Sequence, residues 1–336
     1  TEVGRALKAA KHRYRNSTFA FGPYDAKILM QATLYGLPMV EVQSGSTLSG
    51  DDGFPSADSS FSPPAFGGEL NEGRLSFNLA GTFGDNEETG QGHFPDLDGH
   101  VIFSAGAPIQ PQFYADVSAP QAGTLRGTLF LGGVYTDVAG YDPVIARPHN
   151  EYITDLSEPG FSATGWWPPT AMALQNSDTV SDTADTVILS LGQYHAQEGT
   201  MRLYSQMSLS GLYSNSDDTT PPAIGRIGAV YDPELGMGRI KVEATDPSGI
   251  ARVVVAMTQG DGVWQSQELA YDPAAQKARG VFTGTMGTTF FVQVADGAGN
   301  VAVDNNKGRN YILQGPLPFA PGSNAVSLYL PLLVRE

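Results

Sequence analysis

The chain has no cysteine, which excludes several kinds of site. Without Cys, its 336 residues can form no disulfide, hold no thiolate-bound metal and supply no cysteine nucleophile. The GxGxxG and P-loop patterns of nucleotide sites are absent, and so is the GxSxG context of many serine hydrolases. We therefore expect no catalytic residue of these kinds in this chain.

Charged residues and long apolar runs are also scarce. Charged side chains make up 16% of the chain, and no apolar run approaches the roughly 18–20 residues of a membrane span. Residues 1–50 hold six Lys/Arg against three Asp/Glu, whereas residues 51–336 hold 13 against 32. The acidic part should repel nucleic acid and anionic membrane surfaces, so neither is an expected partner.

Glycine and proline, in contrast, are abundant. The chain holds 40 Gly and 23 Pro, spread without a repeating period. This excludes collagen and favours a mainly β protein rich in turns. Few charged residues are typical of extracellular β-domains, so we expect a secreted or cell-surface protein. The length suits two or three domains.

Residues 1–43 read as a short α/β segment of two helices and a strand. Residues 1–15 have the spacing of an amphipathic helix. A second helix begins after Pro23, and “LPMVEV” supplies the strand. The second helix is too apolar for so short a segment, so its face is an expected interface with a missing α/β part. That face consists of Ile28, Leu29, Ala32 and Tyr35.

The rest of the chain predicts two β-sandwich domains. Residues 44–63 read as a linker rich in Ser, Gly, Asp and Pro, and residues 64–217 contain short alternating runs closed by turn residues. Residues 218–315 have the strand lengths, turn spacing and apparently buried tryptophan (Trp264) of an immunoglobulin or fibronectin-III type sandwich. Residues 316–336 read as a linker and an apolar strand, which carries Leu328, Leu330 and Leu332.

Two acidic turns are candidates for a calcium site. “DPSG” contains Asp246, and “DGAGN” contains Asp296 and Asn300. Calcium prefers the oxygen ligands that Asp, Asn and backbone carbonyls supply, and no other cofactor is expected. The alternative is that these residues close tight turns through bonds to their own backbone, and this alternative is the favoured one.

A second candidate metal set lies in “GHFPDLDGH”. His93, Asp96, Asp98 and His100 bring two imidazoles and two carboxylates within eight residues, and zinc or another transition metal accepts such ligands. Their spacing matches no standard motif, and turns rich in Gly and Asp often have this composition. The turn is the favoured interpretation.

The aromatic turn “GWWPPT” raises a third possibility, glycan binding. Trp166 and Trp167 could form a stacking platform. Adjacent residues of a strand point to opposite faces, however, so at most one ring would be exposed, and core packing is the preferred interpretation.

The motifs “ALKAAKHRYRN” and “YDAKILMQATLYGLPMVEV” carry a family resemblance. Together they resemble the end of the caspase-like peptidase domain of the gingipains, a family of secreted bacterial cysteine peptidases. In that family an α/β catalytic domain is followed by immunoglobulin-like domains, and the predicted order here is the same. The resemblance implies that the catalytic Cys and His lie upstream of Thr1, so none of the family's catalytic residues falls on this sequence.

Two hypotheses of different classes follow. In the first, the chain is the non-catalytic C-terminal portion of a gingipain-like cysteine peptidase. It would support an upstream catalytic chain or domain and serve surface attachment or partner binding. In the second, it is an extracellular structural or adhesive subunit without peptidase activity. It would then assemble by pairing its terminal strand with a sheet edge of its own chain, of another copy or of a cell-surface partner.

Overall fold

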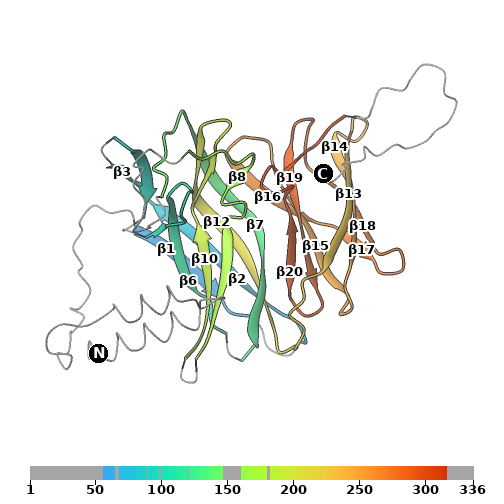
Figure 1. The fold of residues 1–336 in the computed structure, drawn as a ribbon. Helices are drawn as coiled ribbons and strands as arrows, with labels where there is room; N and C mark the ends of the chain where they lie inside the picture. The colour runs from blue at the N-terminus through green and yellow to red at the C-terminus, as the bar shows by residue number, and fades with distance from the viewer. Residues whose placement is uncertain are drawn as a thin grey trace, which may run out of the picture. The chain divides into compact units, whose positions relative to one another are not determined.

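The computed structural model describes residues 56–64, 68–88, 90–97, 100–119, 121–146, 160–179 and 182–315. All regular secondary structure within these residues is β-strand, as the mainly β prediction requires (Figure 1). In this described part of the chain, no helix offers the length and apolar character needed to cross a bilayer. The predicted segment 1–43 and terminal strand of 316–336 lie outside the described residues.

The first sandwich packs two antiparallel sheets face to face. Strand β2 shows why the sheets form, since its residues alternate strictly between buried and exposed positions, which is the period of a half-buried strand. The buried residues of β2 pack with those of the facing strands in one large core. One sheet contains β1 (Ser56–Ser62), β2 (Asn71–Ala80), β12 (Thr200–Ser214) and β7 (Thr124–Ala139), and the other contains β5 (Val101–Ile102), β6 (Gln110–Asp116), β10 (Asp182–Ser190) and β9 (Met172–Thr179).

Shorter strands complete this half of the molecule. Strands β3 (Gly84–Glu88) and β4 (Gly92–Asp96) form a hairpin. Strand β11 (Gly192–His195) pairs with β12 on one side and with β8 (Trp166–Trp167) on the other.

Strand β1 corrects the predicted linker. Residues Ser56–Ser62 pair along their whole length with β2, although the sequence analysis assigned residues 44–63 to a linker. The strand contains four Ser, and its Phe61 is a hydrophobic residue that packs against the core. Backbone hydrogen bonds to the edge of an existing sheet hold such a strand, and they leave no hydrophobic period in the sequence.

The second sandwich has its own two sheets and its own core. Sequence-local hairpins alternate with crossings between the sheets, as a Greek-key arrangement requires. One sheet has the order β13 (Ala223–Asp232), β14 (Met237–Thr245), β18 (Lys277–Phe282), β17 (Ala270–Asp272), and the other has the order β16 (Val263–Glu268), β15 (Ile250–Thr258), β19 (Thr289–Asp296), β20 (Val301–Asp304), with β21 (Tyr311–Ile312) also on β19.

The two sandwiches are joined by pairing as well as by packing. Strand β16 pairs with β7 through Val263↔Val134 and Trp264↔Gly133, so one sheet continues from the first sandwich into the second. A buried cluster of Leu129, Leu212, Val254 and Ala295 lies between them. Residues 54–336 accordingly form one compact unit, and the division into domains at 64–217 and 218–315 stays a prediction.

Trp264 is buried as the sequence predicts, but it packs elsewhere. Only 3% of its surface is exposed, and it belongs to the core cluster of the first sandwich. Its ring contacts those of Phe130 and Phe291, at centroid distances of 6.2 and 5.3 Å. The tryptophan therefore fills the junction between the sandwiches rather than the centre of the second.

The side-chain amide of Gln293 hydrogen-bonds to strand β7 at the junction, as the backbone of a paired strand would. It is fully buried on β19. Its amide nitrogen donates to the carbonyl of Phe130 at 2.9 Å, and its amide oxygen accepts from the Phe130 N–H at 2.7 Å. This pair of bonds satisfies a stretch of β7 backbone that would otherwise be buried without partners.

We expect Gln293→Leu to lower the free energy of unfolding by about 2 to 4 kcal/mol, because it leaves one buried N–H and one buried C=O of Phe130 unpaired. Urea unfolding of the chain measures this change. Gln265→Leu is the matched control, since Gln265 is exposed on strand β16 of the same sheet, and its effect should stay within about 0.5 kcal/mol. Equal effects of the two substitutions would contradict the role given to Gln293.

Candidate metal centre

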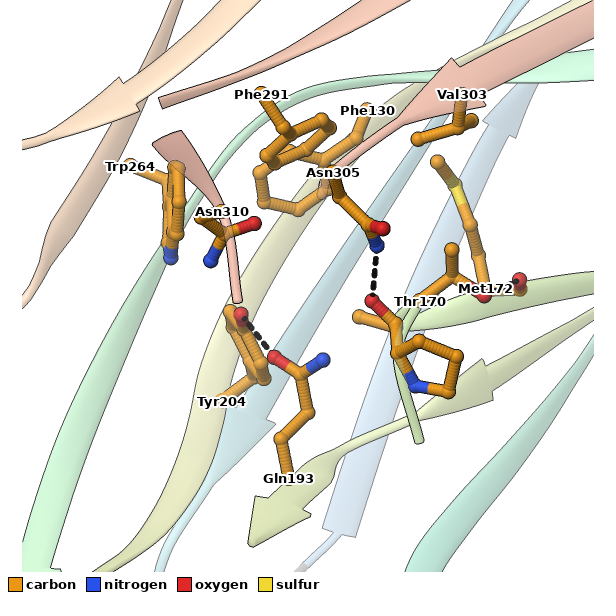
Figure 2. A pocket seen from close by; sticks show the side chains of 12 residues that line it. Phe130, Thr170, Met172, Gln193, Tyr204, Trp264, Phe291, Val303, Asn305 and Asn310 are labelled. Carbon is orange, nitrogen blue, oxygen red and sulfur yellow. Dashed lines mark hydrogen bonds between the residues drawn. The ribbon is translucent and has the colours of Figure 1, made fainter. Parts of the chain in front are cut away.

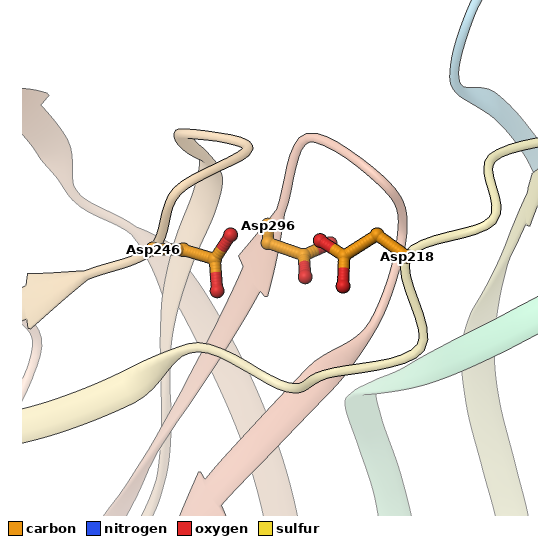
Figure 3. A group of neighbouring side chains, drawn as sticks. All are labelled: Asp218, Asp246 and Asp296. Carbon is orange, nitrogen blue, oxygen red and sulfur yellow. The ribbon is translucent and has the colours of Figure 1, made fainter.

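Three aspartates from separate parts of the chain meet near the junction. Asp218 lies on the connector between the sandwiches, Asp246 follows β14, and Asp296 ends β19 (Figure 3). One carboxylate oxygen from each lies within 4.8 Å of the others. Asp296 is fully buried, whereas Asp218 and Asp246 are half-buried.

Local turn chemistry positions two of these carboxylates. Oδ1 of Asp246 accepts from the N–H and the hydroxyl of Ser248, both at 2.7 Å. Oδ1 of Asp296 accepts from the N–H of Asn300 at 2.8 Å. The turn bonds that the sequence favoured are therefore present, and the same turns bring the two carboxylates together.

The side chain of Asn300 supports the cluster through hydrogen bonds. Its amide nitrogen donates to Oδ2 of Asp296 at 2.9 Å and to the backbone carbonyls of Asp218 and Thr220 at 3.2 and 3.4 Å. Through these bonds Asn300 holds the connector against the buried carboxylate. Its role as a ligand through the amide oxygen stays a prediction.

Asp218 is the member that the sequence analysis missed. It precedes the two prolines of “NSDDTTPP” and lies 28 and 78 residues from the other two aspartates. The only signal was a pair of acidic residues at a domain boundary. Sequence spacing could not indicate the contact, because the fold of the second sandwich creates it.

Gly299 places this turn against the first sandwich. Its φ of +90° belongs to the region that glycine enters without strain. A Cβ at this position would lie 2.9 Å from Leu70 and 3.2 Å from the side chain of Arg126. The turn that carries Asp296 and Asn300 can therefore approach the neighbouring sandwich only with glycine at position 299.

The surroundings of Asp296 disfavour its ionised form. Burial raises the pKa of Asp296 above its ordinary value, and the nearby charge of Asp246 raises this pKa further. Hydrogen bonds from Asn300 and from the backbone of Ala298 act in the opposite direction. A bound cation would relieve the remaining repulsion.

The three oxygens can be ligands of one calcium ion. Calcium binds oxygen ligands at about 2.4 Å, so two ligands of one ion lie at most about 4.8 Å apart. The three carboxylates meet this limit. Three acidic oxygens with waters or carbonyls to complete the shell are a hard-ligand set, which favours calcium over zinc.

The second predicted metal set is not gathered in the same way. His93 Nδ1 lies 3.2 Å from Asp85 Oδ1, and the ring of His100 meets the edge of Tyr114. Asp98 lies outside the described residues. Among the described His, Asp and Glu residues, the group with ligand spacing is that of the three aspartates, and it does not include His93, Asp96 or His100. The metal site of “GHFPDLDGH” stays a prediction.

The tryptophans of “GWWPPT” are both partly buried. The guanidinium of Arg202 lies 4.1 Å from the ring of Trp166, and the ring of His195 meets that of Trp166 at a centroid distance of 5.2 Å. Trp167 contacts Phe161. Packing within the fold thus accounts for both rings, as the preferred interpretation has it.

Comparison with known proteins gives limited similarity. No protein-family model and no curated protein sequence matches the chain. A structure of the complex of RgpB pro- and mature domains from Porphyromonas gingivalis is similar with a TM-score of 0.31 and 13% identity, over 46% of this chain and 84% of that one. A structure of gingipain K from the same bacterium, concerned with zymogenic latency, has a TM-score of 0.34 and 11% identity, over 47% and 93%. Scores this low do not establish a shared fold.

The raised pKa of Asp296 predicts a pH dependence of stability. An acid whose folded pKa is raised stabilises the fold below its unfolded pKa of about 3.9, and this contribution is lost as the pH rises through the folded value. Asp246→Asn removes a neighbouring charge but keeps the oxygen that Ser248 binds. In the presence of a chelator, the variant should therefore gain stability relative to the parent chain as the pH rises from 4 to 7.

Urea unfolding at a series of pH values measures this difference. Asp261→Asn is the control, because Asp261 also accepts a turn hydrogen bond, from the N–H of Val263, but lies outside the cluster. A stability difference for Asp246→Asn that does not change with pH would contradict the electrostatic account.

Proposed function

We propose that this chain is the non-catalytic, secreted β-sandwich portion of a gingipain-like cysteine peptidase. The observation that carries the proposal is the order of its parts: a segment resembling the end of the gingipain peptidase domain, followed by a joined pair of β-sandwiches. The face of Ile28, Leu29, Ala32 and Tyr35 would pack on the catalytic part, with each large apolar side chain contributing about 1.5 to 3 kcal/mol.

The topology of the second sandwich supports the immunoglobulin-like part of this proposal. Immunoglobulin sandwiches carry strands A, B, E and D in one sheet and C, F and G in the other. Read in chain order, the sheet β13-β14-β18-β17 corresponds to A-B-E-D, and β15-β19-β20 corresponds to C-F-G, with β16 added at the edge. Such domains commonly bind partners or carry an attached domain at a surface.

The interior of the described sandwiches supports a non-catalytic role. The chain has no Cys, and the cores are filled with aliphatic and aromatic side chains. The chemistry of the parent protein would then depend on a Cys thiolate and a His base in another part of the precursor. This chain would hold, attach or present that part.

We further propose that Asp218, Asp246 and Asp296 bind one calcium ion that stabilises the junction. The proposal is supported by the meeting of three carboxylates, one of them fully buried, where the connector crosses the ends of β14 and β19. The ion would tie the connector to the second sandwich. It would have a structural role and no part in catalysis.

Calcium should raise the thermal unfolding midpoint of the chain, since a ligand that binds only the folded state stabilises it by about 2.7 kcal/mol at a concentration of 100 times Kd. Differential scanning calorimetry with calcium and with a chelator measures this shift. Asp218→Asn keeps the oxygen that accepts from the N–H of Thr220 and should remove most of the response. Asp261→Asn should retain it. A midpoint that calcium leaves unchanged would exclude the site.

Antibodies against residues 54–336 should recover a peptidase from the medium of the source organism. We expect a longer chain or a second polypeptide with peptidase activity that iodoacetamide abolishes, because alkylation blocks a Cys nucleophile. The recombinant chain of 336 residues is the control and should be inactive. Recovery of this chain alone, without such activity, would instead favour the structural or adhesive subunit.

A further inference from the structure

The cavity at the junction is too small for most ligands. Its volume is about 40 Å³, which gives room for a few water molecules at about 10 to 15 Å³ each. Figure 2 shows the aromatic rings that surround it, those of Phe130, Tyr204, Trp264 and Phe291. An open groove on the second sandwich is much larger, at about 300 Å³, and it reaches the size of small-molecule binding sites.

This groove lies at the end of β14, the strand between β13 and β18 in the sheet. Three segments line it: Glu243–Thr245 of β14, Ala223–Gly225 at the start of β13, and Ala275–Lys277 at the turn into β18. Glu243 and Thr245 alternate with the buried core residue Ala244. Their side chains therefore point outward, away from the core.

A β-bulge shapes the groove on the side of β13. The pairing of β13 with β14 shifts register after Ile224, so that Gly225 and Arg226 lie opposite Glu243. Bulges of this kind redirect side chains and are frequent next to active sites. A Cβ at position 225 would lie 3.2 Å from the Cβ of Glu243, so a larger residue would crowd the groove.

The turn on the opposite side holds a residue in an unfavourable conformation. Gln276 has a φ of 53°, in the left-handed region that costs a non-glycine residue about 1 kcal/mol or more. Its carbonyl accepts from the N–H of Ala244 at 3.3 Å, and Oδ1 of Asp272 accepts from the N–H groups of Ala274 and Ala275 at 3.0 and 3.2 Å. These bonds hold Gln276 beside the groove, where it is exposed.

A block of cations begins at the groove. Strands β14 and β18 pair Glu243 with Lys277 and Lys241 with Arg279, and paired residues share one face of a sheet. Oε1 of Glu243 lies 3.3 Å from Nζ of Lys241 and 3.6 Å from Nζ of Lys277. One carboxylate is thus shared by two lysines, and Arg279 joins neither of these ion pairs. The face carries an excess of positive charge.

Lys241 and Arg279 stand directly opposite each other, an arrangement of like charges that destabilises a sheet. Their row continues with the small residues Gly228 of β13 and Ala270 of β17, so the two charged side chains are the longest in the row. The side chain of Lys241 is 30% exposed, and Arg279 is exposed as well. An anion placed between them would replace repulsion with attraction.

The net charge of the chain does not keep an anion from this face. Residues 51–217 hold four Lys/Arg against 21 Asp/Glu, whereas residues 218–315 hold eight against ten. Charges farther apart than about 8 Å are largely screened at physiological ionic strength. On the face itself, Asp232 is already paired with Arg239. The local cations therefore dominate the field that a ligand meets there.

The groove favours a sugar over an acidic protein segment. The cores of protein interfaces are rich in aromatic and apolar residues, whereas Ile224 is the one large apolar residue among the described residues that line the groove. Glu243, Thr245 and Gln276 offer hydrogen-bonding groups instead. Such groups suit the hydroxyls of a sugar ring.

We propose that the groove and the adjoining cation pair bind a uronic acid residue of an acidic polysaccharide. The sugar ring would lie in the groove, with its hydroxyls hydrogen-bonded to Glu243, Thr245 and Gln276. Its carboxylate would lie outside the groove, away from Glu243 and between Lys241 and Arg279. Binding of this kind requires neither the peptidase relationship nor the calcium site, and it does not involve the tryptophans of “GWWPPT”.

Isothermal titration calorimetry of the 336-residue chain with trigalacturonic acid tests the proposal. A chelator is present throughout, because carboxylates bind calcium and an ion at the aspartate cluster would otherwise compete for the ligand. We expect saturable binding. The trimethyl ester of the same trisaccharide, which has the same rings and no charge, should not bind at the same concentrations.

Arg279→Gln should lower the affinity for trigalacturonic acid about tenfold, because it removes a charge-assisted hydrogen bond to the carboxylate. Arg309→Gln is the matched control. Arg309 is also exposed and belongs to the second sandwich, but it follows β20 and does not line the groove. The control removes the same charge, and its affinity should equal that of the parent chain.

Gln276→Gly tests the groove independently of charge. Glycine adopts the φ of residue 276 without strain, so the substitution removes the amide and keeps the turn, and the affinity should fall about three- to tenfold. Asn310→Gly is the matched control, because Asn310 has a φ of 58° in another turn and does not line the groove. Its affinity should not change.

Four results would each overturn the proposal: no saturable binding, equal binding of the ester, an unchanged affinity of Arg279→Gln, or an unchanged affinity of Gln276→Gly. Triglutamate bound as tightly as trigalacturonic acid would refute the sugar and identify an acidic peptide as the occupant.

Discussion

The structure depends on the junction at which strand β7 serves two sandwiches at once. Its side chains enter the core of the first sandwich, and its backbone continues into the second through β16. Where direct strand pairing stops, the Gln293 amide supplies the two hydrogen bonds that Phe130 requires. A buried backbone must be satisfied, and this requirement fixes the distance between β7 and β19.

The junction explains why the unusual features of the chain gather there. Burying Trp264 between Phe130 and Phe291 leaves a cavity that neither sandwich would have alone. The β19–β20 turn lies against the first sandwich at Gly299, and Asp296 at the start of this turn is fully buried. In both places close packing buries a polar group at an energetic cost. Beside the cavity this group is the indole N–H of Trp264, which has no acceptor among the described residues. In the cluster it is the carboxylate of Asp296, which lies near the charge of Asp246.

The features that depend on neighbouring residues could be predicted from the sequence. These are the strict alternation of β2 and the turns at Asp246 and Asp296, which predict the β class and two members of the aspartate cluster. The strand β1, the contact of Asp218 and the packing direction of Trp264 could not. Each of these depends on residues that are distant in sequence, and a Ser-rich edge strand such as β1 has no hydrophobic period to reveal it.

The aspartate cluster links the connector to the second sandwich in the same physical terms. It exists only where the connector, the turn after β14 and the turn after β19 lie together, and Asn300 donates to two backbone carbonyls of the connector beside it. A cation at the cluster would therefore bind only this arrangement, and its binding free energy would stabilise it. Because such linkage is reciprocal, any substitution that releases the connector would weaken binding of the cation, even where it contacts no ligand.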